Sequence, residues 1–261
     1  MQSGLLRRVW SLGLTVSLLG ARAAYGDFIV VPNAQTTAEG NAFNLIPFSM
    51  GTGGQPTTRY QQVYASAQFG GELGIITQIT FRPDAGVGAP FTGTISNAQI
   101  NFSTTTRAPD ALSTTFASNV GVDDMVVYGR SLTLFSAFTG PPGGPKDFDI
   151  LIDLQAPFFY DPSAGNLLLD IRLFSRLTPT QFLDTQNTTG DLTSRLRSND
   201  GVDSPTGIAD TLGLVTRFTV TTVPEPSTLL LTGLGALVLL YDPRSRRTIR
   251  STEVRHVVAL N

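Results

Sequence analysis

The stretch Asp147-Phe148-Asp149-Ile150-Leu151-Ile152-Asp153-Leu154 decides the fold class of this 261-residue chain. Alternate side chains in a β-strand point to opposite faces. Here the apolar face consists of Phe148, Ile150, Ile152 and Leu154, and the other face of Asp149, Leu151 and Asp153. This period of two predicts a β-strand with one face in a core.

Similar short runs lie on both sides of this stretch, separated by turns rich in Gly, Pro and Asn. Predicted strands cover residues 27–32, 59–64, 75–81, 93–103, 126–128, 131–138, 166–174 and 213–222, with a weaker strand pair in 181–199. Residues 156–161 are expected to turn the chain. One helix is predicted over 106–120, because Leu112, Phe116 and Val120 follow at spacings of four.

A parallel α/β fold would need a helix between most of these strands, and those helices are missing. The pattern therefore predicts an all-β fold, an antiparallel two-sheet β-sandwich that is jelly-roll-like and carries one short helix. We expect this domain to cover residues 27–222, with hydrophobic helices at the two ends of the chain.

The N-terminal residues 1–26 are typical of a signal peptide. Arg7 and Arg8 precede an apolar run over 9–20, and small residues follow at 21–26. The alternative is a signal anchor, but the apolar run is short. Cleavage before Asp27 would commit the domain to export.

The C-terminal end carries Val223-Pro224-Glu225-Pro226, then an uncharged run over 229–241 and a basic cluster formed by Arg244, Arg246 and Arg247. Two prolines favour an extended backbone, and a helix over 228–241 would be about 20 Å long at roughly 1.5 Å per residue. Arginines after an apolar run predict a cytoplasmic C-terminus. The alternative is a buried core helix, which is the commoner identity of so short a run.

This segment over 223–247 resembles the PEP-CTERM sorting signal of exopolysaccharide-producing bacteria. The resemblance implies that an exosortase-type enzyme processes the chain near Pro224-Glu225-Pro226 and that the inner membrane anchors it transiently. Cell surface or extracellular matrix is then the destination, with exopolysaccharide as a further partner. Residues 248–261 would be a short cytoplasmic tail.

Charge is distributed unevenly along the chain. The whole sequence has 18 Lys and Arg against 20 Asp and Glu, but eight of the basic and three of the acidic residues lie outside 27–223. The domain between the two ends therefore holds 10 basic and 17 acidic residues, a formal charge of −7. Such an acidic domain argues against nucleic acid as a partner.

Catalytic residues are not predicted. The single histidine, His256, lies beyond the apolar run, which excludes Ser-His-Asp chemistry and a His-ligated zinc site in the exported domain. There is no cysteine. No cofactor is expected, although calcium stays open at three oxygen-rich places, which are Asp123-Asp124, Asp147 with Asp149, and Asn199-Asp200-Gly201-Val202-Asp203.

Tyr60 and Tyr64 are candidate glycan contacts, because residues four apart on one strand point the same way. The alternative is that both tyrosines lie near the edge of the core with their hydroxyls in water. Hydrolysis of a polysaccharide would need two carboxylates at suitable separation. Asp149 and Asp153 would be about 13 Å apart on one strand, too far for a retaining mechanism.

The expected function is therefore that of an exported cell-surface or matrix protein with a structural or adhesive domain. A carbohydrate-binding module is the first alternative. A hydrolase acting on matrix polysaccharide is the second, and two carboxylates about 5–10 Å apart in a cleft would favour it.

Overall fold

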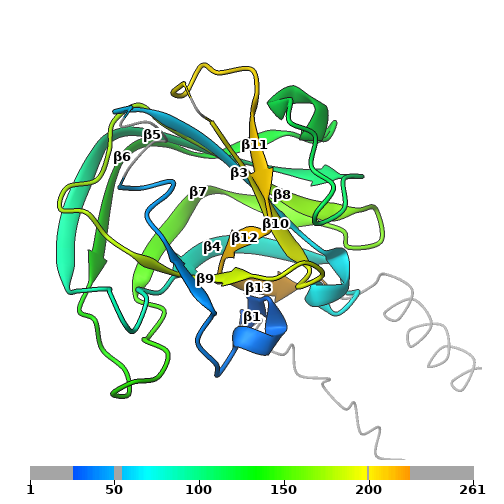
Figure 1. The fold of residues 1–261 in the computed structure, drawn as a ribbon. Coiled ribbons are helices and arrows are strands. Elements are labelled where there is room, and N and C mark those ends of the chain that lie inside the picture. The colour runs from blue at the N-terminus through cyan, green and yellow to red at the C-terminus, as the bar shows by residue number, and fades with distance from the viewer. Residues whose placement is uncertain (1–25, 50–54, 199, 224–261) are drawn as a thin grey trace, which may run out of the picture.

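The computed structural model describes residues 26–49, 55–198 and 200–223 (Figure 1). These residues form an all-β fold of antiparallel sheets, as the alternating pattern predicts. There are three sheets in this part of the chain, not two. The predicted signal peptide and C-terminal hydrophobic helix lie outside the described residues. No helix within the described ranges is long and apolar enough to cross a membrane.

Neighbouring strands in each sheet come from distant parts of the sequence. In spatial order, the four-stranded sheet runs β1 (Asp27–Val31), β13 (Thr216–Thr222), β4 (Gly74–Phe81) and β7 (Ile150–Tyr160). The six-stranded sheet runs β11 (Gly207–Asp210), β10 (Thr193–Ser198), β3 (Thr58–Tyr64), β8 (Asn166–Leu173), β5 (Phe91–Thr105) and β6 (Met125–Ser136). The three-stranded sheet runs β12 (Leu212–Leu214), β9 (Leu183–Asn187) and β2 (Ala42–Asn44).

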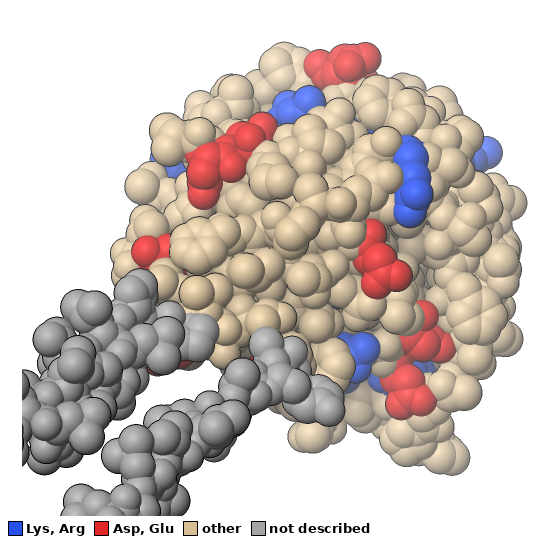
Figure 2. All heavy atoms as spheres, turned by 180° about the vertical axis from the view of Figure 1, so that it is seen from behind, with Lys and Arg blue, Asp and Glu red and all other residues tan. Residues whose placement is uncertain are grey.

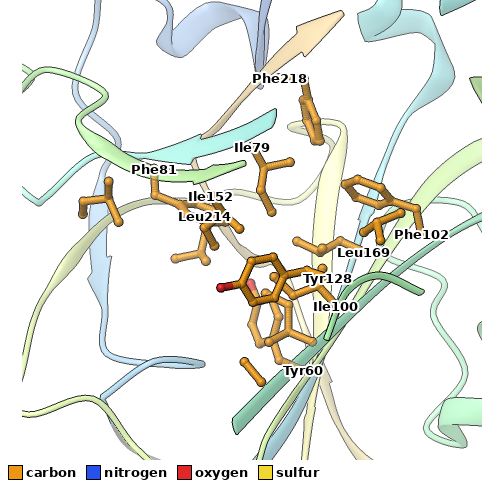
Figure 3. Packing of buried hydrophobic residues seen from close by; sticks show 14 of the residues in the cluster. Tyr60, Ile79, Phe81, Ile100, Phe102, Tyr128, Ile152, Leu169, Leu214 and Phe218 are labelled. Carbon is orange, nitrogen blue, oxygen red and sulfur yellow. The ribbon is translucent and has the colours of Figure 1, made fainter. Parts of the chain in front are cut away.

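The main core draws its side chains from both larger sheets (Figure 3). Phe102 of β5 contacts Phe158 of β7 and Phe218 of β13, with ring centroids 5.5 and 6.3 Å apart. The alternation predicted for the opening stretch is confirmed, because Ile150 and Ile152 are buried while Leu151 and Asp153 are exposed. The strand itself begins at Ile150 and continues to Tyr160.

A second, smaller core covers the outer face of the six-stranded sheet. Val63, Leu168 and Leu196 of that sheet pack there against Leu112 and Phe116. The six-stranded sheet is therefore buried on both faces in this region. Such a sheet does not show the polar and apolar alternation of a half-exposed one.

The segment that supplies this cover was predicted as a helix over 106–120, and that prediction is wrong. Only a 3-10 helix, η4 (Phe116–Asn119), forms there. Ser113 N donates to Asn119 Oδ1 and Asn119 Nδ2 donates to Ser113 O, at 2.8 and 2.9 Å. Side-chain hydrogen bonds of this kind replace helical backbone bonds. Asp110 also has a φ of 61°, which ends any helix.

Two strand boundaries also differ from the prediction. Residues 156–161 do not turn the chain, because β7 runs through them to Tyr160. Pro157 is tolerated there since the β4–β7 register jumps from the Gln78↔Asp153 pair to the Ile76↔Phe158 pair, which leaves it outside the ladder. The two strands predicted over 126–138 are one strand, β6.

The strand pair predicted within 181–199 exists, but its members do not pair with each other. β9 pairs with β2 and β12, and β10 pairs with β3 and β11. Leu183 of β9 is buried in the main core, whereas Leu196 of β10 is buried in the second core. The two strands separate because their apolar side chains belong to different cores.

Both ends of the described domain lie at the same end of two neighbouring strands, β1 and β13, of the four-stranded sheet. Asp27, the first residue of β1, is opposite Val220 near the end of β13. Val223 N donates to Leu73 O at 2.9 Å, the last hydrogen bond of the described domain. The chain thus enters and leaves the fold side by side.

Candidate functional site

The predicted sorting motif is described only at its first residue, Val223. Pro224, Glu225 and Pro226 lie outside the described residues, as do Arg244, Arg246, Arg247 and the sole histidine, His256. The described fold stops at Val223, with its hydrogen bond to Leu73.

Tyr60 and Tyr64 do point the same way, but they cannot contact a glycan, and that prediction is corrected. Both side chains are fully buried in the main core (Figure 3 shows Tyr60). Tyr60 donates its hydroxyl proton to Gln62 Oε1, and the Tyr64 hydroxyl lies 2.9 Å from Thr216 Oγ1. Burial raises the pKa of both hydroxyls above the ordinary range.

Three of the acidic residues at the possible calcium sites, Asp123, Asp124 and Asp149, accept hydrogen bonds from nearby protein groups. Asp123 Oδ1 accepts from Thr104 N at 2.7 Å, and both oxygens of Asp124 accept from Asn101 Nδ2 at 3.0 Å. Asp149 Oδ2 accepts from Ala137 N at 2.8 Å. Asn199 lies outside the described residues. Within the described ranges, none of these carboxylates lies in a group of three side chains that could hold a metal ion.

The one such group in the described part of the chain was not predicted. Glu39, Asp84 and Asp184 each place a carboxylate oxygen within 4.8 Å of the others. They come from the segment before β2, the segment after β4, and β9. Arg82 lies among them and donates from Nε to Asp184 Oδ2 at 2.6 Å.

Burial dominates the electrostatics of this carboxylate cluster. Desolvation raises the pKa of Asp184, although the Arg82 guanidinium opposes it, and desolvation likewise raises the pKa of Glu39. Backbone amides take one oxygen of each side chain: Ala85 N donates to Glu39 at 2.7 Å and Gly40 N to Asp184 at 2.9 Å. Hard cations prefer oxygen ligands, so the free Glu39 Oε2 is the natural first ligand for one. Arg82 already supplies a positive charge there.

A second feature is a surface hollow of about 420 Å³, which we call the threonine hollow. Three parts of the chain line it: the end of β5, the segment around η4, and the end of β7 with the turn that follows. The lining residues are Thr104, Thr105, Thr106, Ser118, Val120, Gly121, Val122, Asp123, Phe159, Asp161 and Ala164. Its volume lies within the range typical of small-molecule sites.

Polar groups without partners face this hollow. The hydroxyls of Thr104, Thr106 and Ser118 make no hydrogen bond within the described part of the chain. Asp123 and Asp161 each use Oδ1 internally, which leaves Oδ2 of both available. The arrangement can donate and accept hydrogen bonds beside an aromatic ring.

Sequence reasoning missed the threonine hollow for an identifiable reason. Phe159 was assigned to a turn, whereas in β7 it points away from the core residues Phe158 and Tyr160 and stays 54% exposed. Continuing the alternation from Ile152 through these residues would have placed Phe158 and Tyr160 inward and Phe159 outward, as the structure has them. The Phe-Phe-Tyr run itself, in which one ring must face out, was the available signal.

No protein-family model, curated protein or solved structure matches this chain.

Proposed function

We propose that this protein is exported and delivered to the cell surface or extracellular matrix through its C-terminal sorting segment, with a structural or adhesive β-domain as cargo. One observation carries the proposal. The last strand within the described residues, β13, ends at Thr222, and the proposed sorting motif begins at Val223. The described strands therefore end just before the residues at which a processing enzyme would act.

The place where the chain enters the domain supports the same proposal. Asp27 is opposite Val220, so the predicted signal peptide and the predicted sorting segment join the domain at one edge. A domain connected in this way can stay folded while the membrane holds either end. Transient anchoring in the inner membrane, with the C-terminus in the cytoplasm, follows from the basic cluster after the apolar run.

In this proposal the four- and six-stranded sheets are the two layers of a jelly-roll-like sandwich. The three-stranded sheet is an addition, attached where Val215 N donates to Asp184 O at 3.1 Å and where Pro83 bridges to Leu183. Sandwiches of this kind are common among surface-displayed domains.

The partners of the protein are an exosortase-type enzyme, the membrane and exopolysaccharide. On the face drawn in Figure 2, Lys and Arg side chains are few and scattered among uncharged surface. Nucleic acid binding requires clustered basic side chains, so this distribution supports its exclusion.

A role outside catalysis fits the carboxylates best. General acid catalysis needs a carboxyl with a raised pKa that a substrate can reach. Asp184, Glu39 and Asp191 have raised pKa values. The Asp184 side chain is completely buried against Arg82, the unbonded oxygen of Glu39 is also buried, and both oxygens of Asp191 accept backbone hydrogen bonds. Asp161 is accessible, but hydrogen bonds from Ser163 lower its pKa, so it stays ionised.

The test is sorting in an exopolysaccharide-producing bacterium, with and without its exosortase-type enzyme. We expect the wild-type chain to reach the surface or medium and to lose residues after about 223–226, as intact mass would show. A variant with Pro224→Ala, Glu225→Ala and Pro226→Ala should keep its full C-terminus in the membrane fraction. Glu253→Ala, in the tail, is the control and should sort normally.

Retention of the wild type in the cytoplasm would overturn the proposal. So would equal processing of the wild type and the triple variant, because the motif would then have no role.

A further inference from the structure

We propose that the threonine hollow binds a saccharide that carries no anionic group. The proposed function names exopolysaccharide as a partner but no place where it binds, and the hollow supplies a place and a class of saccharide. Binding there needs neither export nor processing of the chain, so the two proposals can fail separately.

An exposed aromatic ring forms the apolar wall of the hollow. Phe159 is 54% exposed although its neighbours in β7, Phe158 and Tyr160, are 3% and 2% exposed. Val122, in the same lining, is fully exposed. Single exposed apolar side chains are ordinary, but apolar side chains that share one hollow with hydrogen-bonding groups are typical of a ligand site. The C–H face of a sugar ring is flat, apolar and of matching size.

Hydrogen-bond donors and acceptors lie next to that wall, and sugar hydroxyls need both. The hydroxyls of Thr104, Thr106 and Ser118 can both donate and accept, as can every sugar hydroxyl. Asp123 Oδ2 and Asp161 Oδ2 can accept only. Ligand sites typically combine an apolar wall with a few such polar groups.

The charge of the lining selects against anionic sugars. Two carboxylates line the hollow, and no Lys or Arg is among its lining residues. The guanidinium of Arg107 donates from Nε to Ser118 O at 3.1 Å, so it is tied to the backbone of the lining segment. A uronate, sulfate or phosphate group would meet Asp123 and Asp161 without a compensating cation.

Contacts within the protein hold the lining segments of the threonine hollow in place without a ligand. Gly121 lies so close to β5 that a Cβ there would be 1.8 Å from Thr104 O, and its N–H donates to Ser103 Oγ at 3.1 Å. Asp123 clamps the same strand through Thr104 N at 2.7 Å. A preformed hollow spares a ligand the cost of ordering it.

The experiment is isothermal titration calorimetry on the full chain, purified in a detergent without a sugar headgroup. Three probes are titrated: neutral gluco-oligosaccharides, glucosamine oligomers and oligogalacturonate. We expect binding of a neutral or amine-bearing oligosaccharide and a weaker response, or none, to oligogalacturonate. Phe159→Ala should lower the affinity about tenfold, or about 1.4 kcal/mol, because large side chains at the centre of a contact carry most of its binding energy.

Matched variants separate the hollow from the rest of the surface. Phe135→Ala removes an equally exposed ring, 53% exposed on β6, and should leave affinity unchanged. Phe159→Tyr keeps the aromatic face and should bind like the wild type. The double variant Asp123→Asn, Asp161→Asn keeps the side-chain oxygens that accept hydrogen bonds within the protein but removes both charges. It should reduce the difference in affinity between oligogalacturonate and the neutral probes.

Three outcomes would overturn the proposal. These are no binding of any neutral or amine-bearing probe, equal affinity of the wild type and Phe159→Ala, and stronger binding of oligogalacturonate than of the neutral probes by the wild type.

Discussion

Gln61 and Gln62, neighbours in β3, are both fully buried, and they face different cores. The Gln61 amide reaches outward to Asp170 and to Asn119 beneath the cover of the second core. The Gln62 amide faces the other way and binds both backbone groups of Leu214. Buried amides are tolerated only when such bonds satisfy them. Each glutamine therefore fastens a different segment to the six-stranded sheet.

Gln62→Leu is expected to destabilise the fold by about 2–5 kcal/mol, because buried groups left without a partner each cost about 1–3 kcal/mol. Gln62 Oε1 accepts from Leu214 N at 2.8 Å and from the buried Tyr60 hydroxyl, and Nε2 donates to Leu214 O at 2.9 Å and Thr193 Oγ1 at 3.2 Å. Leucine would fill the space but satisfy none of these groups. Chemical denaturation followed by circular dichroism measures the change.

The control for this prediction is Gln155→Leu. Its side chain is exposed and accepts one hydrogen bond, from Gly129 N at 2.8 Å. A loss of about 1 kcal/mol or less is expected there. Equal losses in the two variants would contradict the role assigned to Gln62.

At the scale of elements, a stack of rings and guanidinium groups holds the segment before β7 against the four-stranded sheet. The guanidinium of Arg217 lies 4.7 Å from the Phe28 ring centroid and 5.0 Å from that of Phe148. Arg82 lies 4.8 Å from the Phe148 ring centroid. Phe148 therefore contacts two cations and Phe28 only one.

This arrangement predicts unequal effects for two similar substitutions. Phe148→Leu should cost about 1–3 kcal/mol, since it removes two cation–π contacts of about 0.5–2 kcal/mol each. Phe28→Leu removes one contact from a ring that is 64% exposed and should cost about 1 kcal/mol or less. Thermal and urea unfolding of both variants give the comparison. An equal or reversed order would show that the stack contributes nothing beyond packing.

The individual elements also show how much of this fold the sequence predicts. Period-two alternation located most strands, including β4 and β13, because each has one face in the main core. Alternation does not show which strands pair with each other, so neither the separation of β9 from β10 nor the third sheet was predicted. Leu112 and Phe116 were recognised as apolar positions with the spacing of a helix, yet the side-chain bonds of Asn119 favour an irregular cover.

The candidate site was predicted less well than the fold. Tyr60 and Tyr64 were placed on one face correctly, but alternation cannot tell that a sheet is covered on both faces. The threonine hollow joins segments from β5, η4 and β7, which meet only once the sheet order is known. Its threonines and Phe159 carry no motif in sequence.

At the scale of the whole molecule, the carboxylate cluster joins parts of the chain that are distant in sequence. Glu39 precedes β2, Asp84 follows β4, and Asp184 lies on β9. Arg82 links them further by donating from Nη2 to Ala38 O at 2.5 Å. The cluster thus fastens the three-stranded sheet to the end of β4, and its ionisation affects the stability of the whole fold.

The sign of that effect follows from the raised pKa values of Glu39 and Asp184. A carboxyl with a pKa raised by folding binds protons more tightly in the folded than in the unfolded state. Its contribution to the free energy of unfolding is therefore fully present below the ordinary pKa, near 4, and is lost as pH rises through the raised value. Over this window the two groups should make the protein less stable as pH increases.

Glu39→Gln tests this directly. The amide keeps an oxygen to accept from Ala85 N but carries no charge, and it places a donor where Oε2 has no partner. We expect the variant to be more stable than the wild type at pH 8 and equally stable near pH 4, where Glu39 itself is protonated. Urea midpoints at several pH values measure the difference. Glu72→Gln removes an exposed carboxylate as the control. A wild type that is more stable than Glu39→Gln at pH 8 would mean that ionised Glu39 holds the cluster together rather than straining it.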